Sequence, residues 1–458
     1  MKMVNPGDFF TAEHLKEFFN SHLRYKKGGG IDGLSPNKFL QLYESKFDII
    51  SNKCLNGTYK FSCYREKLVI KGAKQNPRVL SIPSMRDRLV LGILNEYLQK
   101  VYSEKGYQQN LPNMEIKILK EFLSTYPSKK RIRFLKTDFH NYYGTINRRV
   151  LLNKLGNDVD KQMLSLIRAA IESPTIPKGE NSKNANFKRF GIPQGLSISN
   201  ILAYVYLKDF DDNIGKEFAD VYIRYVDDIL FINPKQLKIL DVMRKYFKGN
   251  KMHLSFTKEK ISKGYIEDGS LNFIGYNISQ NRKISIRQSN VTNFITKLAG
   301  IAKSCKDECE NVDLRPEFRK DDEHFNKYYT SLFNLKIGGF VFSNHKYGWM
   351  NYYQGIDDIH QLYSIDKVVK KRILAKIPDK IRNNVYSLVN VYYDIKDNGG
   401  KRYLTDFGKY DTIEKQKEHL SYMGYDLDGK TEYEITDIFH RYISNLIRQS
   451  ELSLGRIS

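Results

Sequence analysis

Two adjacent aspartates, Asp227 and Asp228, lie in the middle of an otherwise apolar segment, residues 221–232. The residues on both sides of the pair are mostly β-branched or aromatic, so the segment predicts two short buried strands joined by a two-residue turn that the aspartates form. Asp is a common turn residue, and a structural turn is one interpretation. A metal site is the other, because two carboxylates at the tip of an apolar hairpin can hold a cation that carries a phosphate.

A third carboxylate, Asp138, ends the largely apolar run 132–138 and is followed by the aromatic cluster 139–146. An Asp between a strand and a helix is often a helix N-cap. Combined with Asp227 and Asp228, it would instead complete the carboxylate set with which two Mg²⁺ ions are held for in-line phosphoryl transfer. The sequence therefore contains three carboxylates, the type of ligand that Mg²⁺ prefers, in these segments.

A loop rich in glycine, residues 189–200, lies between these acidic segments and leads into the apolar run 201–207. Gly191 and Gly195 permit a close approach of the backbone, and we expect Ser197 or Ser199 to cap the helix that follows. Such an element can lie under a flat ligand such as a base pair. An ordinary Gly-Pro turn before a helix is the alternative.

Composition narrows the class of partner. The 458 residues include 75 Lys and Arg against 52 Asp and Glu, a formal net charge of +23, and also 32 Tyr and 26 Phe. A positive excess along the whole chain, together with many rings, favours binding of nucleic acid. A generic basic protein with solvated lysines is the alternative. The four cysteines predict neither a disulfide framework nor a zinc site. We find no leader-like apolar segment or membrane span, and we expect a soluble, cytoplasmic protein.

The ordered set of motifs resembles that of reverse transcriptases. Asp138 with its aromatic tail resembles polymerase motif A, the loop 191–195 resembles motif B, and residues 225–228 resemble the Tyr-x-Asp-Asp of motif C. In chain order, the other similar segments are residues 31–34 and 57–59 (an N-terminal block of prokaryotic members), 78–88 (fingers), 254–260 (motif D), 271–276 (primer grip) and 348–353 (thumb). The likeness covers about residues 30–280 and, beyond them, the thumb.

This resemblance implies an α+β, right-hand polymerase fold with fingers, palm and thumb and an α-helical C-terminal appendage. The implied boundaries are residues 1–130 for an N-terminal extension and the fingers, 131–280 for the palm with a fingers insertion near 150–190, 281–375 for the thumb, and 376–458 for the helical C-terminal region. Glu172 to Lys188 is polar and is expected to form a surface loop.

The implied activity is RNA-directed DNA polymerisation, a nucleotidyl transfer with two Mg²⁺ ions and deoxynucleotides. Because no Val-Thr-Gly follows the palm and no endonuclease-like or RNase H pattern follows the thumb, the best match is a prokaryotic stand-alone reverse transcriptase of the defence-associated or abortive-infection type. Its partners would be an RNA template, in some members a dedicated noncoding RNA, the DNA product, dNTPs, and a partner protein or a second copy, with no membrane. The alternatives are a polymerase-fold scaffold that binds RNA or protein, and a template-independent nucleotidyltransferase.

The resemblance also implies roles for individual residues. Asp138, Asp227 and Asp228 would be catalytic and would bind the metal ions. Residues matched to nucleotide binding are Arg78, Lys71 with Lys74 as an alternative helper, Tyr143 at the sugar, Gln194, Gly195 and Lys260 as a proton donor to the leaving group. Residues matched to the primer grip are Phe273, Gly275 and Tyr276. A basic thumb surface for a duplex backbone would use Lys283, Arg287, Lys297, Lys303 and Arg315.

Overall fold

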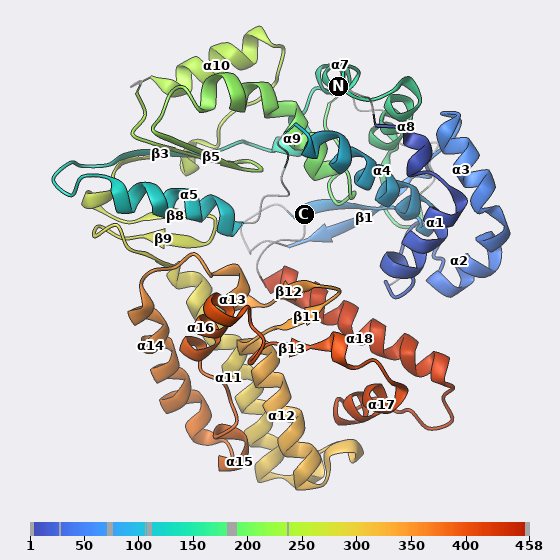
Figure 1. Cartoon of the computed structure of the whole chain (residues 1–458), viewed down its shortest axis with the longest axis vertical. Helices are drawn as coiled ribbons and strands as arrows, with labels where there is room; N and C mark the ends of the chain where they lie inside the picture. The colour runs from blue at the N-terminus through green and yellow to red at the C-terminus, as the bar shows by residue number, and fades with distance from the viewer. Residues whose placement is uncertain are drawn as a thin grey trace. The chain divides into compact units, whose positions relative to one another are not determined.

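The computed structural model describes residues 4–26, 29–70, 77–105, 107, 112–180, 190–235 and 238–453. The chain divides into two compact units, of which the first contains the described parts of 1–110 and 133–263 and the second contains 112–132 and the described part of 264–456. Both units combine helices with small sheets (Figure 1), so the expected α+β class is confirmed.

A four-stranded sheet with the order β5-β6-β3-β7 carries the acidic segments in the first unit. Its strands are β5 (Val221–Tyr225), β6 (Asp228–Ile232), β3 (Arg133–Asp138) and β7 (Ser262–Tyr265). β6 pairs antiparallel with both β5 and β3. Ile229 and Phe231 of β6 join the main hydrophobic core with the helices α9 (Ser199–Phe210) and α10 (Ile239–Gly249). Burial of this strand on both faces explains its unbroken apolar run.

A second sheet of the first unit has the order β2-β1-β4 and includes an antiparallel hairpin of β1 (Tyr64–Val69) and β2 (Arg78–Ile82). The strand β4 (Thr175–Ile176) pairs with β1 in parallel. Part of the expected surface loop 172–188 is therefore a strand, because Ile176 is buried beside β1. The helices of this part are α1 (Ala12–Phe18), α2 (Pro36–Tyr43), α3 (Phe47–Leu55), α4 (Met85–Ser103), α6 (Tyr142–Thr145), α7 (Arg148–Leu155) and α8 (Lys161–Glu172).

The second unit is mainly helical. One small sheet, β10-β9-β8, consists of β8 (Leu271–Phe273), β9 (Tyr276–Ile278) and β10 (Ile284–Ile286), and another, β12-β11-β13, consists of β11 (Phe340–Phe342), β12 (His345–Tyr347) and β13 (Thr405–Asp406). The helices are α5 (Pro112–Thr125), α11 (Gln288–Glu310), α12 (Asp322–Ile337), α13 (Trp349–Tyr352), α14 (Ile359–Val368), α15 (Asp379–Arg382), α16 (Leu388–Asn398), α17 (Ile413–Tyr422) and α18 (Glu432–Ser453). The predicted α-helical C-terminal region is confirmed, with one short strand, β13, within it.

Three local expectations are wrong. Residues Val226 and Asp227 form the hairpin turn, while Asp228 already pairs in β6 with Tyr225. Neither predicted serine caps α9, whose N-cap residue is Ile198. The two serine hydroxyls donate elsewhere: that of Ser199 to the carbonyl of Pro193, and that of Ser197 to the carbonyl of Leu91.

The expectation that Arg315 lies on an exposed basic surface is also wrong. The side chain is buried, and its guanidinium donates to the carbonyl of Glu308, the carbonyl of Lys320 and the carboxylate of Asp322. It therefore closes the connection between α11 and α12. The four cysteines are free thiols in the structure. No described helix has the length and apolar character needed to cross a bilayer.

Candidate active site

The sheet of the first unit brings the three aspartates to one end of two neighbouring strands. Asp138 is the last residue of β3 and lies opposite Asp228, the first residue of β6. The backbone N–H of Phe139 donates to the carbonyl of Asp227 at 3.2 Å, which ties the turn of the hairpin to the end of β3. Residues almost ninety positions apart in the sequence are thus joined by the antiparallel register.

The hairpin turn is strained and is held by a buried ion pair. Val226 has φ of 57°, a left-handed conformation that is unfavourable for a β-branched residue. Arg224 donates to the carbonyl of Val226 at 3.0 Å, and its guanidinium also makes a salt bridge with Asp211. Both side chains of this pair are largely buried. Arg224 therefore positions the turn that carries Asp227.

The electrostatics of the sheet edge are those of crowded anions. Burial, followed by the charges of Asp138 and Asp228, raises the pKa of Asp227 to about 6. Burial also raises the pKa of Asp228, with Lys136 opposing and Asp138 adding to the shift. Like charges at short range raise one another's pKa. The raised pKa values of Asp227 and Asp228 therefore show that the protein only partly compensates the negative charge of the three aspartates. A cation bound at this edge would remove the repulsion.

Lys260 and Thr257 contact the carboxylate of Asp138. The Lys260 ammonium donates to Oδ2 at 2.6 Å, and the Thr257 hydroxyl donates to Oδ1 at 3.0 Å. Burial lowers the pKa of Lys260, but the hydrogen bond to Asp138 and the charges of the three aspartates together raise it above its ordinary value. Lys260 is therefore a positively charged group at the edge that carries the three aspartates.

Among the described residues, no group of three or more His, Cys, Asp or Glu side chains has a geometry ready to hold a metal ion. Both carboxylate oxygens of Asp138 already accept hydrogen bonds, from Thr257 and Lys260. The donor set nevertheless fits a hard divalent cation: three carboxylates share one sheet edge, and two of them have raised pKa values.

Tyr143 lies close enough to both Asp227 and Arg78 for their charges to shift its pKa. Tyr143 is buried on α6, and its hydroxyl donates to Oδ1 of Asn200 at 2.6 Å. Burial, and then the charge of Asp227, raise the pKa of Tyr143, while Arg78 opposes the shift. Lys71 and Lys74 lie outside the described residues.

The loop with Gln194 and Gly195 packs on the strand β2. The Ser81 N–H donates to the carbonyl of Gln194 at 2.7 Å. Gly195 has φ of 94°, and a Cβ there would lie 3.3 Å from the Ser81 carbonyl oxygen. Gly191 is more restricted still, with φ of 82° and only 2.8 Å from such a Cβ to the carbonyl oxygen of Gly144. Both glycines are thus required by backbone contacts, as the sequence suggested.

The residues matched to the primer grip lie in the second unit. Phe273 and Tyr276 are buried, and they flank a two-residue turn, Ile274 and Gly275, with φ values of 41° and 87°. The carbonyl of Gly275 accepts the N–H of Arg287 at 3.1 Å. The carbonyl of Ile274 accepts the Tyr352 hydroxyl at 2.8 Å, so side chains of the same unit hold the turn in place.

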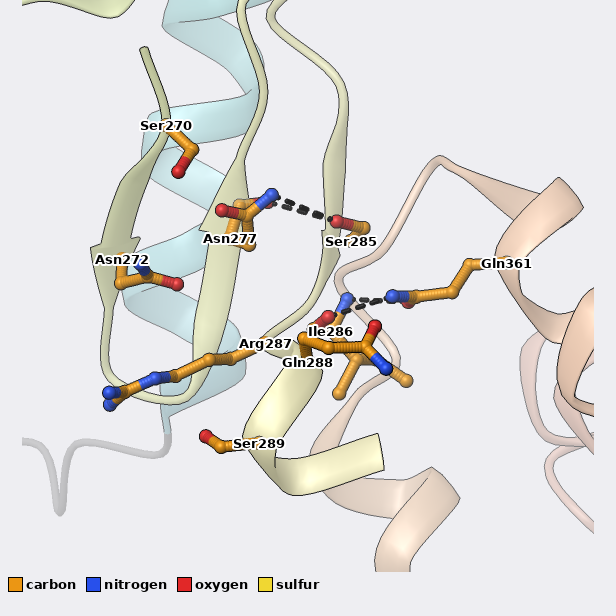
Figure 2. A pocket seen from close by; sticks show the side chains of 9 residues that line it. All are labelled: Ser270, Asn272, Asn277, Ser285, Ile286, Arg287, Gln288, Ser289 and Gln361. Carbon is orange, nitrogen blue, oxygen red and sulfur yellow. Dashed lines mark hydrogen bonds between the residues drawn. The ribbon is translucent and has the colours of Figure 1, made fainter. Parts of the chain in front are cut away.

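A polar pocket of about 320 Å³ opens beside this turn, on the sheet β10-β9-β8 (Figure 2). Asn272, Asn277 and Ser285 form a row across the three strands, and Arg287 and Gln288 lie at the start of α11. None of the described residues that line the pocket is acidic. Gln361 of α14 bonds both the N–H and the carbonyl of Ile286, at 2.7 and 2.8 Å, and so fixes one wall.

Four positioning residues were missed by the sequence analysis: Thr257, Asn200, Arg224 and Asp211. An Arg within the otherwise apolar strand 221–225 was the one visible signal, because a charge in a buried strand requires a partner. Thr257 and Asn200 have no distinguishing pattern. Their roles depend on contacts with residues 119 and 57 positions away.

Carboxylates gathered at a hairpin and at the adjoining strand end of an antiparallel sheet are a donor set suited to divalent cations and phosphoryl transfer. Comparison with known proteins gives the class more narrowly. Residues 69–278 match the family model described as reverse transcriptase (RNA-dependent DNA polymerase). Residues 69–278 are therefore assigned as a reverse transcriptase domain, and with this domain the protein is an enzyme, an RNA-directed DNA polymerase. Domains of this kind generally use divalent metal ions.

Individual relatives are distant. The chain is similar to the protein YkfC of Escherichia coli, with 20% identity over 325 residues that cover 59% of this chain and 83% of YkfC. It is also similar to a putative COX1/OXI3 intron 2 protein of Saccharomyces cerevisiae, with 23% identity, over 44% of this chain but only 23% of the yeast protein. Among solved structures, a telomerase from Candida albicans in complex with a fragment of telomeric RNA has a TM-score of 0.44 and 14% identity, over 92% of this chain and 68% of that one.

Proposed function

We propose that the protein extends a primer with deoxynucleotides on an RNA template, and that Asp138, Asp227 and Asp228 hold two Mg²⁺ ions for this reaction. The observation that carries the proposal is the common sheet edge of the three aspartates, where the charges of Asp138 and Asp228 contribute to raising the pKa of Asp227. Bound divalent cations would activate the primer hydroxyl and neutralise charge on the transferred phosphate.

The side chains around this edge have separate tasks in the proposal. Asp138 and Asp227 would be the principal ligands, and Asp228 the supporting one. Lys260, held on Asp138, would donate its proton to the leaving pyrophosphate. Arg78 would bind the triphosphate through its guanidinium fork, and the backbone at Gln194 and Gly195 would lie against the templating pair. Tyr143 would exclude the ribose 2′-hydroxyl.

On the primer side, the turn at Gly275 would support the 3′ end of the strand. The acid-free pocket beside it supports this assignment, because amides, hydroxyls and the Arg287 guanidinium suit a sugar-phosphate backbone. Domain boundaries at 131–280 for the palm and 281–375 for the thumb belong to the same proposal.

The test is extension of a labelled DNA primer on an RNA template by purified protein with dNTPs and Mg²⁺. The wild type and Asp241→Asn, a change of an exposed aspartate on α10, should both extend the primer. Asp227→Asn should reduce extension by roughly 10³-fold or more, because the variant loses a ligand of the catalytic metal ions. Equal extension by the wild type and Asp227→Asn would refute the proposal.

We also propose a role in bacterial antiviral defence, on the resemblance of residues 348–353 to the thumb of antiviral reverse transcriptases. Trp349 of this segment stacks on Phe294 of α11 with 4.1 Å between ring centroids, so the motif is part of the bundle core. Cells that express the wild type should reduce the plating efficiency of a phage panel, and cells that express Asp227→Asn should not. Equal plating in both strains would contradict this role.

A further inference from the structure

A continuous helical segment of the second unit, α14 followed by η10 (Val369–Ile373), has one apolar and one basic face. Its apolar residues Leu362, Ile365, Val369 and Ile373 are buried against the bundle that includes α11 and α16. The helix lies along one side of the bundle (Figure 1). On its opposite face, exposed residues recur at intervals of three or four positions. The exposed residues of that face are His360, Tyr363, Ser364, Lys367, Lys370 and Lys371.

The three lysines of this face have no neutralising carboxylate. None of them forms a salt bridge within the part of the chain that the structure describes. The one acid of the segment, Asp366, faces the bundle, where its carboxylate accepts the N–H groups of Leu388 and Val389 at 2.8 and 3.1 Å. By contrast, Lys415 on α17 is paired with Asp411 at 2.7 Å. The face of α14 and η10 is therefore a local excess of positive charge that is held rigidly by the packed side of the helix.

The exposed ring of Tyr363 lies among these lysines, with 57% of its surface exposed. Lysines bind phosphates, a free ring stacks on an unpaired base, and the neighbouring hydroxyl of Ser364 and ring of His360 can bond a ribose hydroxyl. A membrane surface does not fit, because the apolar face that would enter the lipid is already buried in the protein.

We propose that the face of α14 and η10 formed by His360, Tyr363, Ser364, Lys367, Lys370 and Lys371 binds single-stranded RNA. The choice of RNA rests on the proposed function, in which RNA is the template. These residues differ from the thumb residues expected from the sequence to contact a duplex backbone. The surface would hold an unpaired segment of the template RNA or of an RNA that accompanies it.

The test is fluorescence anisotropy of a labelled RNA oligonucleotide without secondary structure, titrated with full-length Asp227→Asn protein at several salt concentrations. Replacement of Lys367, Lys370 and Lys371 by Gln should lower the slope of log Kobs against log salt by about 2, because each phosphate contact on a single strand contributes roughly 0.7. Tyr363→Ala should weaken binding about tenfold without changing the slope, and Tyr363→Phe should restore it.

The matched control replaces Lys409, Lys415 and Lys417 by Gln, three exposed lysines at and near α17 with the same total charge. It should leave the slope close to that of the parent, and the circular dichroism melts of all variants should coincide. An unchanged slope for the α14–η10 variant, or an equal loss in the control, would overturn the inference. Equal affinity for DNA of the same sequence would overturn the assignment to RNA.

This assay contains no nucleotides, so its outcome is independent of synthesis. If the α14–η10 variants lose RNA binding while the wild type fails to extend a primer, the polymerase proposal fails and the RNA surface stands. If extension is normal and the variants bind RNA like the parent, only the present inference fails.

Discussion

Lys260 and Asp138 form a direct ion pair, with 2.6 Å between Nζ and Oδ2, although they are 122 positions apart in the sequence. The Asp138 side chain is 6% exposed, whereas that of Lys260 is 58% exposed, so the lysine reaches in from the solvent side to a fixed carboxylate. The aspartates raise the pKa of Lys260, so its ammonium stays charged at the same edge at which the proposed cations bind.

Replacing Lys260 should change both the rate of nucleotide addition and its dependence on pH. Lys260→Met removes both the proton donor and a positive charge that lowers the pKa of Asp227. We expect the rate of nucleotide addition to fall on the order of 10²-fold and the acidic limb of its pH profile to move to higher pH. Lys260→Arg should retain the position of the limb. Pre-steady-state incorporation measured from pH 5.5 to about 8.5 checks both effects, and an unmoved limb in Lys260→Met would contradict the pairing.

Asp227→Asn should stabilise the protein while it abolishes synthesis. Burial and neighbouring anions raise the pKa of Asp227 from 3.8 to about 6, so keeping it charged costs folding free energy that is absent below about pH 3.8 and complete above about pH 6. Removing the charge should therefore add on the order of 3 kcal/mol at pH 7 without metal, and nothing near pH 3.5. Thermal melts at both pH values measure this, with Asp241→Asn as the control. A stabilisation that is independent of pH would contradict the explanation.

Tyr143→Ala should relax the choice of sugar. The ring is buried and fixed by its hydrogen bond to Asn200, so truncation opens space beside the site of Asp227. We expect the ratio of NTP to dNTP incorporation to rise at least tenfold, whereas Tyr143→Phe, which keeps the ring, should leave the ratio near that of the wild type. An unchanged ratio in Tyr143→Ala, or an equal rise in Tyr143→Phe, would contradict the steric explanation.

The pair Arg224 and Asp211 should stabilise the hairpin turn. Arg224→Met leaves Asp211 charged and largely buried, which should cost about 3–5 kcal/mol of unfolding free energy. The double variant Arg224→Met with Asp211→Leu should recover much of this loss. Urea unfolding of both single variants and the double variant gives the coupling energy. Additive losses would show that the two side chains act independently.

The sequence predicted the elements that carry the aspartates well, because apolar runs, turn residues and their order are local signals. The strands around Asp227 and the one that ends at Asp138 were found in this way, and so were the two glycines of the loop 191–195. The exact turn was missed by one residue, since nothing in the sequence reveals that Val226 adopts a left-handed conformation supported by Arg224.

The remaining parts of the site depend on contacts between distant segments. Thr257, Asn200 and Asp211 are ordinary polar residues in the sequence and acquire their roles only through the packing around the sheet. Arg315 shows the opposite error: a basic residue near other basic residues suggests an exposed surface, yet the fold buries it to join α11 and α12. One sequence cannot separate these cases without knowledge of its tertiary contacts.

The central claim is that the edge formed by Asp138, Asp227 and Asp228 binds divalent cations. Titration of Mn²⁺, as a paramagnetic substitute for Mg²⁺, followed by electron paramagnetic resonance in the presence of a non-hydrolysable dNTP, tests it most directly. We predict that the wild type and Asp241→Asn bind Mn²⁺ alike and that Asp138→Asn and Asp227→Asn each weaken binding at least tenfold. Unaltered Mn²⁺ binding in both aspartate variants would contradict the account.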